Sequence, residues 1–193
     1  AVPGKWHLMG VMLSAAGSFQ WYKNQVGLEE QKIENEGGVN AYETLTKQAE
    51  QVKAGSEGLF FLPYLSGERT PHPDPYARAC FIGMSLRHQK QHHTRAVLEG
   101  VSYGLNDSLS LMRKLGVNPS EIILSGGGSR SRLWKQMLAD VFATPCAMVN
   151  ALEGAAYGAA ILAAVGVGGF ATVEEACNAF IEKIETVNPG QEQ

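Results

Sequence analysis

The stretch from Ile122 to Trp134 constrains the possible fold of this chain more than any other segment. A short run of aliphatic residues leads into three consecutive glycines (Gly126, Gly127 and Gly128), and an amphipathic helical pattern follows them. Because glycine has no Cβ atom, such a loop can adopt positive φ angles and lie flat against a planar partner. The helix that follows turns its free N–H groups and the positive end of its dipole toward the loop. The pattern therefore predicts a strand, a bare loop and a helix start that together can hold a nucleotide.

The triple glycine is not specific by itself. It matches neither the G-x-G-x-x-G pattern nor a Walker A loop, because no Gly-Lys-Ser/Thr sequence follows it. A tight turn between a strand and a helix is an equally good interpretation of three glycines alone. The rest of the sequence has to decide between the two.

The order of the predicted elements indicates one α/β domain without internal repeats. Strands are predicted at residues 79–86, 121–124 and 146–149, and the end of a strand at residues 6–10. Helices are predicted at residues 13–26, 40–52, 92–115, 132–142, 154–165 and 173–184. The three prolines of residues 66–75 predict an extended loop. The late alternation of strands and helices indicates right-handed crossovers in a partly parallel sheet.

Composition and charge exclude several classes of protein. The chain has 193 residues, 45% of them hydrophobic and 18% charged, which is ordinary for a globular domain with one core. A net charge of −3 without a basic run argues against a nucleic-acid-binding surface. The apolar stretch at residues 154–168 is shorter than the ~20 residues of a membrane span, and the first residues lack an apolar secretory segment. We therefore expect a soluble, cytoplasmic protein that binds neither nucleic acid nor membrane.

Cysteine and histidine spacing predicts no metal site. The three cysteines, Cys80, Cys146 and Cys177, are widely spaced and lack a C-x-x-C pair, so we expect reduced, buried thiols. His88 and His92 have the i, i+4 spacing of metal ligands on a helix, but the H-E-x-x-H pattern is missing. A solvated surface pair is the preferred interpretation of these two histidines.

Further motifs precede the triple glycine in a characteristic order. They occupy residues 59–64, 66–78, 83–86 and 94–101. Together with the triple glycine, this series resembles the C-terminal half of the FGGY carbohydrate kinases, and the resemblance extends from about Trp6 to about Ala164. His93 departs from the pattern, because the family usually has an aliphatic residue there.

The resemblance implies a fold, a domain organisation and an activity. It implies that residues 1–193 are the C-terminal, adenosine-binding domain of a two-domain sugar kinase with the actin-like ATPase (ribonuclease H-like) fold. This is an α/β fold with a mixed sheet flanked by helices, here without its first strands. The N-terminal sugar-binding domain, the first phosphate loop and the general-base aspartate would precede this chain, so no catalytic residue is expected in it. ATP is the expected cosubstrate, with Mg²⁺ held through the nucleotide phosphates, and a ketopentose hydroxyl is the expected phosphoryl acceptor.

Two alternatives to this function remain. The first is a kinase of the same family for another substrate, such as glycerol, a different polyol or a different ketose. The second is a non-catalytic module that folds and self-associates without binding nucleotide.

The family places phosphate or ribose contacts at the start of the first predicted helix. These contacts map to Ala16, Gly17 and Gln20 in a run of small residues that can expose backbone N–H groups to a polyphosphate. The alternative is a capped helix whose small face packs against the sheet.

The family also places adenine and ribose contacts at the triple glycine. We expect contacts from Gly126, Gly127, Gly128 and Ser129, and Arg132 lies where relatives have an adenosine-contacting asparagine. An arginine there could stack its guanidinium on the purine. A solvated residue in the first helical turn is the alternative for Arg132.

The predicted helix at residues 154–165 has one face without bulk. Gly154 and Gly158, like Ala155 and Ala159, recur at i, i+4 spacing, so another backbone can approach closely. We interpret this face mainly as packing beneath the glycine loop, and secondarily as shaping an adenine pocket.

Self-association is also expected. A sheet without its first strands would leave an unpaired edge and an apolar surface, which favour contact with another chain. The expected product is a homodimer that buries Trp6, Leu8 and their neighbours.

Overall fold

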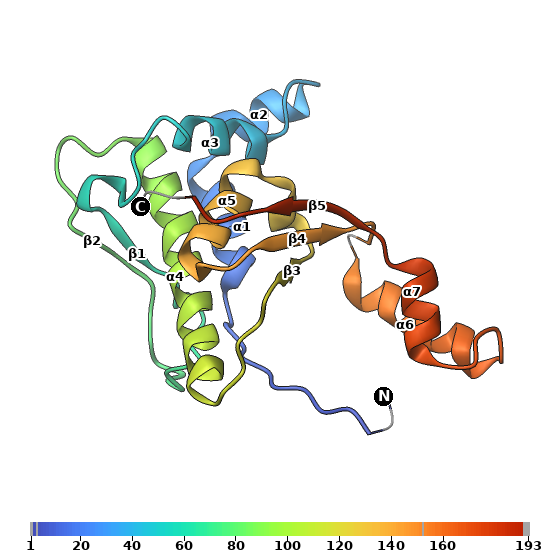
Figure 1. Ribbon diagram of the computed structural model, residues 1–193. Helices are drawn as coiled ribbons and strands as arrows, with labels where there is room; N and C mark the ends of the chain where they lie inside the picture. The colour runs from blue at the N-terminus through green and yellow to red at the C-terminus, as the bar shows by residue number, and fades with distance from the viewer. Residues whose placement is uncertain (1, 3, 152, 191–193) are drawn as a thin grey trace.

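The computed structural model describes residues 2, 4–151 and 153–190. The helices of this part (Figure 1) are α1 (Ala15–Val26), α2 (Leu28–Asn35), α3 (Ala41–Ala49), α4 (Lys90–Lys114), α5 (Arg132–Phe142), α6 (Gly154–Gly166) and α7 (Val173–Phe180). The strands are β1 (Phe60–Leu62), β2 (Cys80–Ile82), β3 (Ile122–Leu124), β4 (Cys146–Val149) and β5 (Lys183–Val187). Two short 3₁₀ turns, η1 (Ser56–Gly58) and η2 (Gly127–Arg130), complete the list.

The strands form two sheets. In the larger one, β3 pairs in parallel with β4, and β4 pairs antiparallel with β5, which gives the order β3-β4-β5. Helix α5 covers one face of this mixed sheet, whereas Ile123 and Val149 point to the other face, toward α6 and α7. The smaller sheet is the antiparallel pair β1–β2.

Helix α4 is the central element and separates the two sheets (Figure 1). It packs against α1, α3, α5 and β1. Its side chains Val97, Leu98 and Val101 are fully buried. Gly100 is required on this helix, because a Cβ atom there would collide with the carbonyl oxygen of Phe61 in β1. The close approach fixes β1 on the helix.

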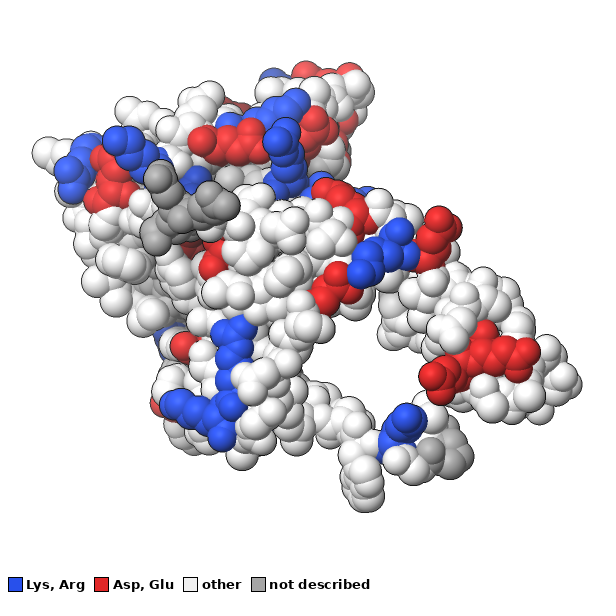
Figure 2. Space-filling view, in the orientation of Figure 1, with Lys and Arg blue, Asp and Glu red and all other residues white. Residues whose placement is uncertain are grey.

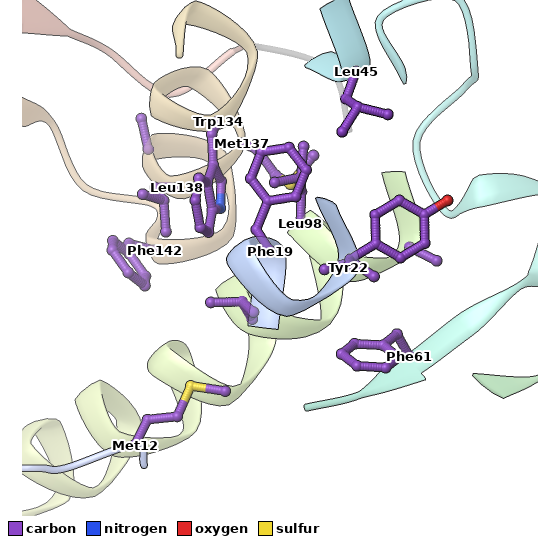
Figure 3. Close-up of a cluster of buried hydrophobic side chains, with 14 of the residues drawn as sticks. Met12, Phe19, Tyr22, Leu45, Phe61, Leu98, Trp134, Met137, Leu138 and Phe142 are labelled. Carbon is purple, nitrogen blue, oxygen red and sulfur yellow. The ribbon is translucent and has the colours of Figure 1, made fainter. Parts of the chain in front are cut away.

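The main core lies where α1, α4 and α5 meet (Figure 3). Phe19 from α1 contacts Trp134 from α5 edge to face, with ring centroids 5.9 Å apart. Each large side chain buried here stabilises the fold by about 1.5–3 kcal/mol. The core therefore holds the helix after the glycine loop rigidly against α1 and α4.

The C-terminal region differs from the sequence prediction. The predicted helix at residues 173–184 ends at Phe180, and residues 183–187 form β5 instead. The β-branched residues Ile184, Thr186 and Val187 suit a strand, and the free edge of β4 provides its hydrogen-bonding partner. Tertiary pairing therefore overrides the helical pattern at this point.

Other predictions also need correction. No strand forms at residues 6–10, where the chain is extended and Trp6 is 98% exposed. The predicted strand at residues 79–86 shortens to β2.

Cys146 is buried, but Cys80 is exposed and Cys177 is partly exposed, so the prediction of three buried thiols was wrong for two of them. His92 is buried, which excludes the solvated pair predicted for His88 and His92.

Charges of both signs are interspersed on the face seen in Figure 2. Lys183 and Glu121 form one of the ion pairs of the molecule, at 2.7 Å. Within the described residues, none of the helices combines the length and the apolar character that crossing a membrane requires.

Candidate functional site

The glycine loop begins with a backbone conformation that favours glycine. Gly126 has φ 83° and ψ −175°, a region that side-chain-bearing residues almost never adopt. The chain then makes the turn η2 rather than passing directly into a helix. The hydroxyl of Ser129 is buried and donates to the carbonyl oxygen of Gly126 at 2.7 Å. Ser129 therefore uses its hydroxyl to hold the turn together.

Helix α5 begins at Arg132 and is capped by the preceding residue. The hydroxyl of Ser131 accepts a hydrogen bond from the backbone N–H of Trp134 at 3.3 Å. Arg132 is exposed, which leaves its guanidinium accessible to a ligand or to solvent.

The second and third glycines of the loop differ in their surroundings. A Cβ atom on Gly127 would meet nothing within 4 Å, and Gly127 is exposed, so its backbone is open to a ligand. A Cβ atom on Gly128 would lie 3.1 Å from the six-membered ring of Trp134. Gly128 is therefore needed for packing inside the molecule, whereas Gly127 faces outward.

Trp134 joins the two candidate nucleotide segments, although the sequence did not single it out. Its indole ring lies against Gly128 on one side and contacts Phe19 of α1 on another. Its Nε1–H donates to the hydroxyl of Ser102 in α4 at 3.1 Å. One sequence signal could have identified Trp134. It is an aromatic residue in the first turn of a helix that follows a glycine loop.

The start of α1 carries the other candidate segment. Ala16, Gly17 and Gln20 are all exposed, whereas Ser18 and Phe19 are buried on the opposite side of the helix. Of the run of small residues, Ser14 and Ser18 are therefore packed inside the molecule, and only Ala16 and Gly17 are on the surface. No side chain caps the helix at Ser14, so its first N–H groups are open to an anion.

The proline-rich loop at residues 66–75 fixes the segment that leads into α1. The Ser14 and Ser66 hydroxyls are 2.7 Å apart, which diverts Ser14 from capping. The buried carboxylate of Glu68 accepts the backbone N–H of Leu13 at 3.2 Å. The N–H of Thr70 donates to a carbonyl oxygen of the same segment at 3.1 Å. The loop and the helix start therefore behave as one unit.

Helix α6 comes close to the residue before the glycine loop at its own first residue, Gly154. A Cβ atom on Gly154 would lie 3.4 Å from the hydroxyl oxygen of Ser125, the residue before the loop. Gly158 lines an apolar cavity of about 570 Å³ between β3, α6 and α7, and Ala155 and Ala159 line it too. Gly154 thus packs beside Ser125, whereas Ala155, Gly158 and Ala159 line this cavity.

Neither a metal cluster nor an activated thiol is evident in the described part of the chain. Residues 2, 4–151 and 153–190 contain no group of three or more His, Cys, Asp or Glu side chains that could hold a metal ion. Burial, together with the nearby carboxylates of Asp140 and Glu121, raises the pKa of the Cys146 thiol to about 11. The thiol is therefore protonated at neutral pH and is not a nucleophile.

Comparisons with known proteins identify the family. Residues 1–167 match the model of the C-terminal domain of the FGGY family of carbohydrate kinases. A xylulose kinase of Staphylococcus epidermidis is 42% identical over 192 residues, which cover 100% of this chain and 37% of that kinase. A gluconokinase of Bacillus subtilis is 34% identical over 164 residues, covering 84% of this chain and 32% of that enzyme.

Solved structures agree with the family match. The crystal structure of a xylulose kinase from Brucella ovis superposes with a TM-score of 0.81 at 34% identity, covering 98% of this chain and 37% of that one. This match confirms the predicted actin-like ATPase fold class. The chain spans about a third of the length of the relatives that it matches. By its sequence and its fold, the chain belongs to the FGGY family of carbohydrate kinases.

Proposed function

We propose that this chain is the adenosine-binding C-terminal domain of a xylulokinase. The observation that carries the proposal is the 42% identity to a xylulose kinase along the whole chain. The whole enzyme would transfer the γ-phosphoryl group of ATP to a hydroxyl of D-xylulose and form D-xylulose 5-phosphate. Because a gluconokinase is among the relatives, the alternative is a kinase of the same family that acts on another substrate, such as a sugar acid, a polyol or a different ketose.

In this proposal the nucleotide lies between the glycine loop and the start of α1. The backbone of Gly126, Gly127 and Gly128 contacts adenine and ribose, supported by the open surroundings of Gly127. Arg132 stacks on the purine, and Ser129 contributes by shaping the turn.

The phosphates extend toward Ala16, Gly17 and Gln20 on the exposed side of α1. The open N–H groups of the helix start suit their negative charge. Mg²⁺ would be held through the phosphate oxygens of the nucleotide.

The remaining roles fall outside this chain. The sugar and the general base would belong to an N-terminal domain, as the family resemblance implies, because none of the proposed nucleotide contacts is a carboxylate. Catalysis in such a kinase rests on positioning and charge stabilisation. We further propose that the protein is cytoplasmic and forms a homodimer.

Two measurements test the proposed function. In a coupled assay with xylulose and Mg-ATP, this chain alone should show only the background rate. Turnover that follows the purified chain would contradict the proposal that the general base lies outside it.

In calorimetry, ADP should bind with an affinity near the millimolar range, about −4 kcal/mol. Gly127→Val should abolish this binding and leave the unfolding midpoint nearly unchanged. Retained ADP binding in Gly127→Val would contradict the proposed site.

A further inference from the structure

The first turn of α1 lacks the side-chain cap that its own sequence could provide. Ser14 is the N-cap residue of α1, and serine is one of the residue types that favour this position. A serine there normally accepts the N–H group of the second or third helical residue, here Ala16 or Gly17. In the described structure the hydroxyl of Ser14 makes no such hydrogen bond. The N–H groups of Ala16 and Gly17 therefore have no acceptor within the helix, and both residues are exposed.

Other helices of this chain are capped in the usual way. The side chains of Asn40, Ser131 and Thr172 accept N–H groups at the starts of α3, α5 and α7. The backbone at Ser131 and Thr172 is extended, with ψ angles of 119° and 157°, whereas the ψ angle of Ser14 is 26°. Ser14 thus differs from these capping residues in its backbone as well as in its side chain.

The proline-rich loop holds Ser14 in this conformation. The hydroxyl oxygen of Ser14, a buried residue, lies 2.7 Å from the hydroxyl oxygen of Ser66. The preceding residue, Leu13, donates its N–H to the buried carboxylate of Glu68 at 3.2 Å. On the other side, the carbonyl oxygen of Ser14 accepts the N–H of Ser18 at 2.8 Å. Hydrogen bonds therefore fix the segment before and after the hydroxyl that would otherwise cap the helix.

The position of the loop is set by contacts that do not involve α1. Glu68 and Asp74 exchange two backbone hydrogen bonds of 2.9 and 3.0 Å, which close the loop on itself. The hydroxyl of Ser108 in the central helix α4 donates to the carbonyl oxygen of Thr70 at 3.2 Å. Because these contacts tie the loop to itself and to α4, they place Ser66 independently of the helix start that it contacts.

We propose that Ser66 is a positioning residue for the nucleotide phosphates. By binding the hydroxyl of Ser14, it keeps that hydroxyl away from the N–H groups of Ala16 and Gly17, which are then available to an anionic ligand. A capping hydroxyl and a phosphate oxygen would compete for the same two donors. This inference rests on the proposed function, in which phosphates bind at the start of α1, and adds the residue that keeps this place open.

Titrations with ADP and with adenosine, followed by amide NMR, test the role of Ser66. In Ser66→Ala the released hydroxyl of Ser14 should cap α1 and weaken ADP binding by ~5-fold, the equivalent of the ~1 kcal/mol that a serine cap contributes. Adenosine binding should stay the same, because adenosine carries no phosphates. In the double variant Ser66→Ala/Ser14→Ala the competing hydroxyl is gone, so ADP binding should return to that of the unmodified chain.

Two further variants serve as controls. Ser66→Thr keeps the hydroxyl and should bind ADP like the unmodified chain. Ser108→Ala removes another hydroxyl that holds the same loop but leaves the contact between Ser14 and Ser66 in place, so its ADP affinity should also be unchanged. Unaltered ADP binding in Ser66→Ala would overturn the inference. A loss that Ser14→Ala does not reverse would overturn it as well, because Ser66 would then act by direct contact with the phosphates or only through the fold.

Amide hydrogen exchange tests the same inference without a ligand. In Ser66→Ala the exchange rate at Ala16 or Gly17 should fall by ~5-fold, because the hydroxyl of Ser14 now accepts one of these N–H groups. The double variant Ser66→Ala/Ser14→Ala should regain the original rate. Unchanged exchange in Ser66→Ala would contradict the inference. If the unmodified chain binds no ADP, the proposed function fails, whereas exchange still decides whether Ser66 holds Ser14 away from the helix, so the two failures are distinguishable.

Discussion

The indole N–H of Trp134 in α5 donates a buried hydrogen bond of 3.1 Å to the hydroxyl of Ser102 in α4. The same ring lies 3.1 Å from the place that a Cβ atom on Gly128 would occupy, and it contacts Phe19 of α1. Trp134 therefore sets the position of the glycine loop relative to the helix that carries the other candidate nucleotide contacts. The arrangement makes the loop sensitive to changes in the core beneath it.

We first predict that Trp134 and Ser102 are energetically coupled. Ser102→Ala should destabilise the fold by about 1–3 kcal/mol, because it leaves the buried indole N–H without an acceptor. In Trp134→Phe the same replacement at Ser102 should cost at least ~0.5 kcal/mol less, since the donor is gone. Urea unfolding of the four proteins measures the cycle, with Trp6→Phe as the control for an exposed tryptophan. Strictly additive effects would show that the hydrogen bond is not formed.

The second prediction separates two neighbouring glycines. Gly128→Ala should destabilise the chain by about 1–3 kcal/mol, because the added methyl group would lie 3.1 Å from the ring of Trp134. Gly127→Ala adds a methyl group that meets nothing within 4 Å, so its unfolding midpoint should stay close to that of the unmodified chain. Thermal unfolding of both variants decides the matter. Equal destabilisation of the two would contradict the loop geometry.

A third prediction concerns the tether between the proline-rich loop and α1. Glu68→Ala removes the acceptor for the N–H groups of Leu13 and Arg69 and should cost about 2 kcal/mol. Glu68→Gln keeps an acceptor oxygen and should recover part of that loss. Hydrogen exchange at the Leu13 amide is the direct readout, and it should accelerate more in the alanine variant than in the glutamine variant. An unchanged exchange rate in Glu68→Ala would rule out the tether.

The fourth prediction is a pH dependence that arises from Cys146. Burial raises the pKa of this thiol in the folded protein from 9.0 to about 11, so the fold retains the proton that the unfolded chain loses. The corresponding stability is fully present below pH 9 and is lost as the pH rises toward 11, up to about 3 kcal/mol. Cys146→Ala should be less stable at pH 7 but lose less stability between pH 9 and 10.5. Parallel pH profiles for the two proteins would contradict this assignment.

Local sequence patterns predicted the central elements well. The long apolar periodicity of α4 indicates a helix by itself, and the short apolar runs of β3 and β4 form the strands that were predicted for them. Helix α2 was not predicted, because its residues are mostly polar and its support is tertiary. Glu30 of that helix is buried and accepts hydrogen bonds from Lys90 of α4 and Gln48 of α3. Strand β5 likewise depends on the free edge of β4.

The candidate site could be predicted only in part, for the same reason. The conformation of Gly126 follows from its residue type, and the exposure of Ala16, Gly17 and Gln20 agrees with the sequence expectation. The role of Trp134 depends on residues far apart in the sequence, which no local pattern reveals.

The most direct test of the account is a titration of the chain with ADP followed by amide NMR. The account predicts that the shifted resonances cluster at residues 126–132 and 16–20, the two segments that Trp134 and Phe19 connect. Adenosine should reproduce the changes at residues 126–132 alone, because it lacks the phosphates. Shifts that lie elsewhere, or that persist in Gly127→Val, would contradict the nucleotide site.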